Sequence, residues 1–263
     1  MIQPLSRERL IALARAFRVL PIVEKVHAAR AVRLAEEENA RFLEAHPGKV
    51  LPPADLIRRT YGDPSLRHFE NWGRTNAEEI ASVLAPHLSS DRPKVAEWGC
   101  GLGRVGQHLP SDWDYTGFDI DPSSIGWCEA NLKGTFHLNQ PSPPLPCADA
   151  QFDAVFAISI YTHLSAEAHR VWPHEIARIL KPGGVFAFTV HGAPQAQNLL
   201  GSERRNFDEG ALVVRGGVQE GSRTYLAYHP QPYVDEVLLA PFKKLSGPDP
   251  LCEQTVYIGQ KPS

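Results

Sequence analysis

Residues 95–104 have the sequence VAEWGCGLGR, and this stretch decides the fold class. Its first residues predict a short strand that ends near Glu97, and Gly99, Gly101 and Gly103 follow at alternate positions. Glycine lets a backbone turn sharply and lets a ligand touch it, because no Cβ intervenes. A strand, a tight glycine turn and a helix start form a small-molecule site at the carboxyl edge of a parallel sheet. A carboxylate there disfavours a pyrophosphate and favours a cationic or amino-bearing ligand.

Strands and helices alternate after Lys94, which indicates a doubly wound α/β sheet. We predict one helix after the glycine turn from about Val105, a second after Asp121 and a third from Ser165 to Leu180. The predicted strands cover residues 94–98, 114–120, 135–138, 153–159, 185–190, 242–246 and 254–260. The expected core is therefore a mostly parallel, seven-stranded, Rossmann-like sheet.

Two segments do not follow this alternation. Residues 1–90 carry apolar residues at helical spacing, with helices predicted within 6–45 and near 54–60 and 75–88. We interpret this part as a helical appendage that could form a lid, and residues 91–263 as the main domain. Within the main domain, residues 192–241 are an expected insertion, with a polar β-hairpin at 211–229 and a short helix at 231–240.

The composition narrows the class of protein. The chain has 263 residues, 43% of them hydrophobic, and a net charge of −3, which argues against a broad nucleic-acid surface. Its four cysteines form no Cys-x-x-Cys pair, so we expect no zinc site or disulfide framework and a reducing, cytoplasmic setting. The N-terminus lacks the apolar core of a signal peptide, and no apolar run approaches the ~20 residues of a membrane span. We expect a monomer or homodimer.

Four segments, in this order, resemble the class I S-adenosylmethionine-dependent methyltransferases, in particular small bacterial members of types 11 and 12. They are EWGCGLG at 97–103, GFDIDP at 117–122, the segment that enters the fourth strand at 145–156, and EIARILKPGGVF at 175–186. The resemblance implies S-adenosylmethionine as the methyl donor and S-adenosylhomocysteine as the product.

The resemblance also implies a set of cofactor contacts. Asp119 would accept both ribose hydroxyls, Ile120 would flank the adenine, and Asn139 stands where the family often has an acid that binds the adenine amino group. The amide carbonyl of Asn139 can still accept from that group; Asp149 is the alternative, because prolines 141–146 obscure the alignment. The full expected set is Glu97, Gly99, Cys100, Gly101, Gly103, Asp119, Ile120, Asn139 and Ser159.

The acceptor is expected at the carboxyl end of the fourth strand, where His163 follows. A histidine can take a proton near neutral pH, so His163 is either a general base or a residue that fixes the loop before Ser165. Tyr161 and His191 are further catalytic candidates. The predicted function is methyl transfer to a small molecule, with a hydroxyl of a sugar-like or natural-product compound as the acceptor.

Other interpretations remain open at this point. Residues 101–106 also fit Gly-x-Gly-x-x-Gly, so a nicotinamide-dependent oxidoreductase is the first alternative. An RNA methyltransferase and a catalytically idle cofactor-binding module are the others. Asp119 and Asp121 resemble a metal-binding Asp-x-Asp, but we favour Asp121 as the cap of the helix at Pro122 and expect no metal.

Overall fold

The computed structural model describes residues 20–263, so the part of the predicted helical region before Leu20 lies outside the described residues. The chain divides into two compact units, with the boundary between Phe69 and Glu70. Residues 70–90 therefore belong to the same unit as the sheet. Within the described part, no helix is long and apolar enough to cross a membrane.

The first unit is helical. It contains α2 (Leu20–Ala45), α3 (Ala54–Tyr61) and the first turn of α4 (Leu66–Leu84). Asn39 joins these helices, because its amide nitrogen donates to the Pro64 carbonyl and its amide oxygen accepts from the Leu66 N–H. The helix predicted near 54–60 is confirmed. The helix predicted at 75–88 begins earlier, at Leu66.

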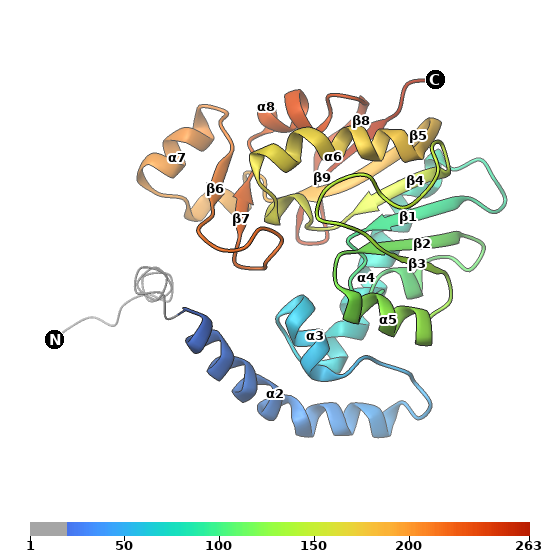
Figure 1. Ribbon diagram of the computed structural model, residues 1–263, viewed down its shortest axis with the longest axis vertical. Helices are drawn as coiled ribbons and strands as arrows, with labels where there is room; N and C mark the ends of the chain where they lie inside the picture. The colour runs from blue at the N-terminus through green and yellow to red at the C-terminus, as the bar shows by residue number, and fades with distance from the viewer. Residues whose placement is uncertain (1–19) are drawn as a thin grey trace. The chain divides into compact units, whose positions relative to one another are not determined.

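The second unit is built on a seven-stranded sheet in the order β3-β2-β1-β4-β5-β9-β8 (Figure 1). Strands β1 to β5 are parallel, β9 is antiparallel to β5, and β8 is antiparallel to β9. The strands are β1 (Lys94–Trp98), β2 (Asp114–Asp119), β3 (Thr135–Leu138), β4 (Phe152–Ala157), β5 (Leu180–Val190), β8 (Lys243–Leu251) and β9 (Gln254–Gln260). The predicted mostly parallel sheet is confirmed.

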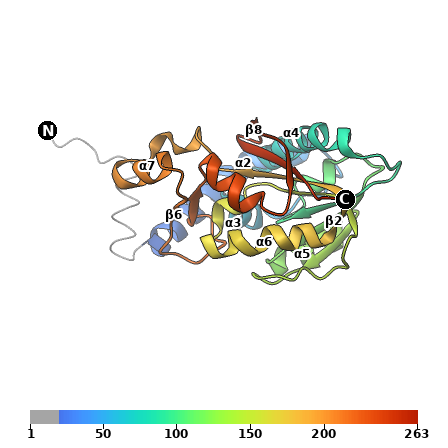
Figure 2. The same cartoon turned by 90° about the horizontal axis from the view of Figure 1, so that it is seen from above.

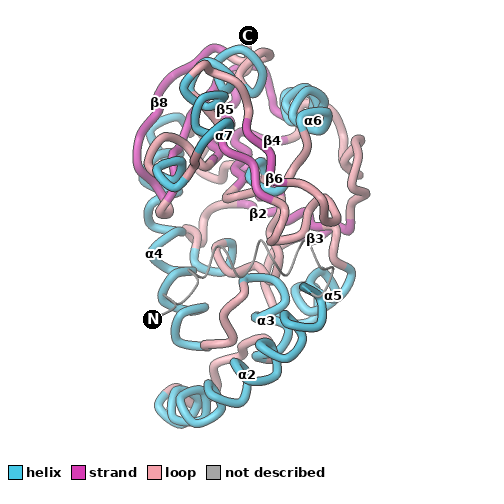
Figure 3. Tube along the Cα trace, turned by 90° about the vertical axis from the view of Figure 1, so that its left-hand side faces the viewer, coloured by secondary structure: helices cyan, strands magenta, loops and turns pink. Residues whose placement is uncertain are grey.

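Successive residues of the central strands pack on opposite faces of the sheet, as the pleat requires. Val155 of β4 belongs to the cluster that includes α6 (Ala166–Ile179), whereas Ala154 and Phe156 belong to the cluster on the other face. That second cluster contains residues of α4 and of α5 (Pro122–Asn131). Helices α4 and α6 accordingly lie on opposite sides of the sheet (Figures 2 and 3).

The prediction of a helix after the glycine turn is wrong. Residues 101–105 form successive turns, and only a short 3₁₀ helix follows at Gly106–His108. Leu109 then adopts an extended backbone, with φ −64° and ψ 160°. Leu109 precedes Pro110, and a residue before proline is driven away from the helical region by the proline ring. The segment is therefore too short for a regular α-helix.

The insertion contains more helix than the sequence pattern indicated. The predicted hairpin is present as the antiparallel pair β6 (Val213–Arg215) and β7 (Leu226–Tyr228). The helix α7 (Gly201–Asp208) was not predicted, because its single buried apolar residue, Phe207, gives no helical periodicity. The predicted helix at 231–240 is short and irregular, consisting of α8 (Gln231–Tyr233) and a π-helical turn at Val234–Leu238.

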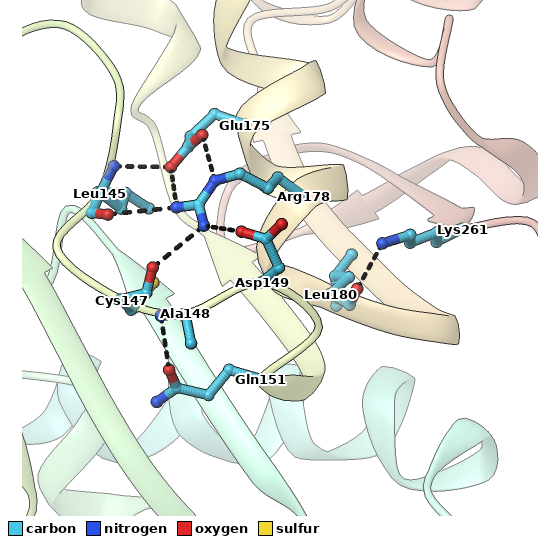
Figure 4. Close-up of polar contacts among 9 residues, drawn as sticks. All are labelled: Leu145, Cys147, Ala148, Asp149, Gln151, Glu175, Arg178, Leu180 and Lys261. Carbon is cyan, nitrogen blue, oxygen red and sulfur yellow. Dashed lines mark hydrogen bonds and ion pairs between the residues drawn. The ribbon is translucent and has the colours of Figure 1, made fainter.

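The proline-rich segment before β4 is held by Arg178 of α6 (Figure 4). The Arg178 guanidinium bonds Glu175 and Asp149, each at 2.6 Å, and donates to the carbonyls of Leu145 and Cys147. Glu175 in turn accepts from the Leu145 N–H at 2.6 Å. One guanidinium thus fixes a segment that can form neither a helix nor a central strand.

Candidate cofactor and acceptor site

The glycine loop follows β1 at the carboxyl edge of the sheet. Gly99, Gly101 and Gly103 all have positive φ, between 52° and 82°, a conformation that glycine adopts without strain. A Cβ on Gly99 would lie 2.0 Å from the Ile160 side chain, and one on Gly103 would lie 2.4 Å from Leu132. Close packing against these side chains therefore requires glycine at two of the positions, independently of any ligand.

Asp119, the last residue of β2, faces this loop. Its two carboxylate oxygens accept from the backbone N–H of Gly101 at 2.7 Å and of Asp121 at 2.8 Å. Burial raises the pKa of Asp119, and backbone N–H donors, those of Asp121 and Gly101 foremost, oppose that shift. A carboxylate offers about four acceptor positions, so two hydroxyl donors can still bind. Asp119 could therefore hold a ribose at the edge between β1 and β2, and this contact stays a prediction.

Glu97 lies inside the sheet unit rather than on an open surface. Its side chain is buried, and the Tyr115 hydroxyl donates to it at 2.6 Å. Burial raises the pKa of Glu97 to about 8, although the Tyr115 bond and the nearby Arg104 oppose that shift. Burial therefore favours the protonated form of this carboxyl in the structure, and a contact of Glu97 with the cofactor stays a prediction.

Three other expected cofactor residues differ in how much of the side chain a ligand could reach. Ile120 is 47% exposed, which suits an apolar wall for an adenine. Asn139 is buried; its amide nitrogen donates to the Gln140 carbonyl, and among the described residues its amide oxygen has no hydrogen-bond partner. That oxygen is available for an amino group. Cys100 points its side chain into the core against Gly117, so only its backbone can face a ligand.

Ser159 follows β4 with φ +63°, a conformation that is strained for a residue other than glycine. Its backbone N–H donates to the Thr189 hydroxyl at 2.8 Å, and its own hydroxyl bonds Thr162 and Gln254. Two strands, β5 and β9, and the following turn thereby hold one strained residue at the carboxyl edge of the sheet.

His163 ends the short 3₁₀ turn at Tyr161–His163 that comes after Ser159. Its Nδ1 bonds the carbonyl of Tyr225 at 2.8 Å. Because a carbonyl only accepts, Nδ1 carries the proton in the neutral ring, and Nε2 keeps its lone pair. Burial lowers the pKa of His163, with a further contribution from Arg223, so the ring is neutral at pH 7. This is the form that a general base needs.

A group of buried aromatic and imidazole side chains lies next to this turn. The rings of His169 and Tyr161 are 5.4 Å apart, and those of His169 and His229 are 5.0 Å apart. Burial lowers the pKa of His169 and of His191 to about 4, and that of His229 well below its ordinary value. In the described part of the chain, the two ring nitrogens of His229 have no hydrogen-bond partner of good geometry, and the same holds for the Tyr161 hydroxyl.

The other two predicted catalytic residues, Tyr161 and His191, have different surroundings from His163. Tyr161 is fully buried, and burial raises the pKa of its hydroxyl well above the ordinary value, so it does not serve as a phenolate base. His191 follows β5 and lies beside Tyr228, with ring centroids 5.4 Å apart. Sequence reasoning missed Tyr115 and Tyr225 as partners of Glu97 and His163, because only the tertiary fold brings these residues together.

Asp121 caps α5. Its carboxylate accepts from the N–H groups of Ser123 and Ser124 and from the Ser124 hydroxyl. The cap interpretation is confirmed. Within residues 20–263, no group of three or more histidine, cysteine or acidic side chains is arranged to hold a metal ion.

Comparison with known proteins agrees with this geometry. Residues 96–188, which run from β1 into β5, match the family described as "Methyltransferase domain". Residues 96–188 form a methyltransferase domain of the class I, S-adenosylmethionine-dependent kind. The predicted family and its cofactor are thereby confirmed, and a nicotinamide-dependent oxidoreductase is not favoured.

Three similar proteins illustrate the range of this domain. The chain is 32% identical to a fatty-acid O-methyltransferase of Mycolicibacterium smegmatis over 176 residues, 60% of this chain and 61% of that protein. It is 32% identical to a tRNA (carboxymethyluridine(34)-5-O)-methyltransferase of Arabidopsis thaliana over 46% of this chain and 34% of that protein. The chain thus spans less than two thirds of either relative. The crystal structure of Streptomyces venezuelae DesVI has the same fold, with a TM-score of 0.57 and 16% identity over 82% of this chain and 100% of that one.

Proposed function

We propose that the protein transfers a methyl group from S-adenosylmethionine to an oxygen atom of a small-molecule acceptor. The observation that supports the methyl donor in this proposal is the arrangement of Asp119 and Asn139 at the ends of β2 and β3. Asp119 keeps acceptor capacity for two hydroxyls, and the amide oxygen of Asn139 is buried without a partner among the described residues. These groups match the ribose hydroxyls and the amino group of an adenosine, and the exposed Ile120 between them matches its flat apolar face.

The relatives support oxygen as the acceptor atom. The Mycolicibacterium protein is named as an O-methyltransferase of fatty acids, and the Arabidopsis protein methylates an oxygen according to its name. Three histidines, which follow β4, β5 and β7, have lowered pKa values and are neutral at pH 7: His163, His191 and His229. Neutral imidazoles suit an uncharged hydroxyl better than a carboxylate, which supports a hydroxyl acceptor here.

In this proposal the bound donor supplies a methyl group on a positively charged sulfur. The chain itself binds the adenosine through Asp119 and Asn139 and aligns the acceptor, and alignment alone is worth on the order of 7–11 kcal/mol. Nε2 of His163 takes the proton of the acceptor hydroxyl, because Nδ1 is already protonated against Tyr225. Since its pKa lies below 6.5, we expect turnover to persist through neutral pH and to fall only under acidic conditions, as the ring gains a proton.

Calorimetry with S-adenosylhomocysteine and with NAD tests the cofactor. We expect binding of S-adenosylhomocysteine and none of NAD. Asp119→Ala should weaken that binding about 10–100-fold, because charge-assisted hydrogen bonds are each worth about 1.5–3 kcal/mol. Asp114→Ala, at the opposite end of β2, is the matched control and should bind as the wild type does. Binding of NAD alone, or equal loss in both variants, would contradict the cofactor assignment.

A second experiment tests the catalytic assignment. Purified protein is screened for S-adenosylhomocysteine release with hydroxyl compounds and with medium-chain fatty acids. We expect release with a hydroxyl compound, and His163→Ala should lower kcat about 10²–10⁴-fold while it leaves S-adenosylhomocysteine binding unchanged. Turnover of fatty acids alone would overturn the hydroxyl proposal, and absence of any turnover would favour an idle binding module.

A further inference from the structure

The loop between β6 and β7, residues 216–225, lies against the turn that carries His163. The N–H of Gly221 donates to the His163 carbonyl at 2.9 Å. Tyr225, at the end of the same loop, accepts through its carbonyl from Nδ1 of His163 at 2.8 Å. The backbone and the ring of His163 are therefore both held by one loop, from residues more than fifty positions later in the chain.

Glu220 fixes this loop to the helix that follows His163. Its carboxylate accepts from the backbone N–H of Ser165 at 2.7 Å. Ser165 is the N-cap of α6, and its hydroxyl accepts from the Ala168 N–H. The N–H groups at a helix start have no partners within the helix, and the helix dipole favours a negative charge there. The loop thus ends on a charge-assisted bond beside the first turn of a 14-residue helix.

The same loop also reaches the cofactor side of the site. A Cβ on Gly221 would lie 3.5 Å from Cδ1 of Ile120, the residue that follows β2. The loop therefore contacts His163, which follows β4, and lies close to Ile120, which follows β2. A segment in this position can set the geometry of a base toward a substrate.

We propose that loop 216–225 positions His163 in its basic tautomer and that Glu220 is the positioning residue that keeps the loop in place. This inference rests on the proposed role of His163 as the base. Without the Tyr225 carbonyl, either ring nitrogen could carry the proton, and only one of the two forms presents a lone pair at Nε2. Among charged and titratable groups, Arg223 lowers the pKa of His163. His163 in turn lowers the pKa of His191, which follows β5.

Nitrogen NMR of the full chain labelled at histidine tests the proposal without any acceptor. The signals of His163 are assigned by their loss in His163→Gln. In the wild type we expect one tautomer, protonated at Nδ1, with a pKa below 6.5. Glu220→Ala should give a mixture of tautomers and a pKa closer to 6.5, because burial is the largest cause of the lowered pKa and is relieved when the loop leaves. Glu220→Gln keeps an acceptor for the Ser165 N–H and should restore the wild-type spectrum.

Limited proteolysis gives a second measurement on the same variants. Trypsin cleaves after Arg223, inside the loop, when the loop opens. Glu220→Ala should be cut at this position about fivefold faster than the wild type, because local opening controls the rate. Glu209→Ala, which removes an exposed glutamate of the same insertion, is the matched control and should be cut at the wild-type rate.

Two results would overturn the inference. One is a wild-type His163 that is protonated at Nε2. The other is a Glu220→Ala variant that matches the wild type in tautomer, pKa and cleavage rate. Failure of the proposed function would give different results. His163→Gln would leave turnover unchanged, or S-adenosylhomocysteine would not bind. The tautomer of His163 would still be the expected one.

Discussion

Glu97 shows how a single residue of a sequence motif can have a different role from the one its position suggests. As an acid at the end of β1, it is expected to present a negative charge to a ligand. In the structure it is buried and bonded to Tyr115, and its pKa is raised to about 8. Tyr115 also limits its neighbours, since a Cβ on Gly106 would lie 2.1 Å from its ring. Glu97 and Tyr115 therefore form a buried pair that lies against Gly106, just after the glycine loop.

The raised pKa of Glu97 predicts a pH dependence of stability. The unfolded carboxyl ionises near pH 4.5, whereas the folded one keeps its proton up to about pH 8. Between these values the folded state binds more protons, so the free energy of unfolding falls as pH rises. Each pKa unit corresponds to about 1.4 kcal/mol, so the total fall is on the order of a few kcal/mol.

Urea denaturation of Glu97→Gln at pH 5, 6.5 and 8 measures this effect. The amide cannot ionise, so the variant should lose less stability over this range than the wild type. Glu78→Gln, an exposed glutamate of α4, is the control and should follow the wild-type curve. Parallel curves for all three proteins would contradict the buried, protonated state of Glu97.

At the residue scale, the sequence predicted positions better than partners. Asp119, Ile120 and Asn139 lie at strand ends, as the alternation of strands and helices required. The partners Tyr115 for Glu97 and Tyr225 for His163 are separated by 18 and 62 positions from the residues they bond. Local pattern and propensity contain no information on such pairings, because they depend on sheet register and on the path of the insertion.

Helix α5 depends on its cap. At the N-terminus of this helix, the Asp121 carboxylate accepts three hydrogen bonds. Asp121→Ala should lower the free energy of unfolding by about 1–2 kcal/mol, whereas Asp121→Asn, which is an equally good cap, should cost only a few tenths. Thermal or urea unfolding measures both. Equal loss in the two variants, or stabilisation of the wild type by Mn²⁺, would restore the metal-binding interpretation.

Helix α6 is tied to the proline-rich segment by Arg178 (Figure 4). Arg178→Ala leaves the buried Glu175 without its counter-charge and should cost on the order of 2–3 kcal/mol, less than a fully buried pair because the guanidinium is partly exposed. Arg178→Lys should recover little, since an ammonium cannot reproduce the planar fork. The exposed pair of Arg204 and Asp208 is the control, and Arg204→Ala should leave urea unfolding unchanged. Full recovery by lysine would contradict this account.

At the element scale, prediction failed where apolar periodicity was absent or misleading. Val105 and Leu109 suggested a helix after the glycine turn, but Pro110 forces Leu109 into an extended conformation. Helix α7 was missed because its residues are polar except for Phe207. The apolar cores of β4 and β5 were located correctly, because continuous apolar runs are typical of parallel strands covered on both faces. Strand β5 nevertheless begins at Leu180, five residues before its predicted start.

The charge of the whole molecule bears on the remaining alternative, an RNA substrate. One similar protein is named as a tRNA methyltransferase, whereas this chain has a net charge of −3. Neutralisation of phosphates dominates nucleic-acid affinity and requires a basic surface. Gel-shift titration with bulk tRNA should therefore show no complex at about 0.15 M salt. A complex whose affinity falls steeply with added salt would favour the RNA methyltransferase.

The mostly parallel, seven-stranded character of the sheet followed from the sequence, because a chain that alternates strands with helices has few ways to form a parallel sheet. The predicted order of motifs along the chain then placed Glu97, Asp119 and Ser159 at one edge. The path of residues 192–241 did not follow, since short strands and polar helices set no pattern of their own. That path nevertheless determines what surrounds His163.

The burial of Glu97 beside Tyr115 has a consequence for how the activity of such chains is judged. A variant that modified no acceptor would still bury these two side chains against each other. The acid at the end of β1 is therefore no evidence of activity by itself, and activity has to be tested at His163.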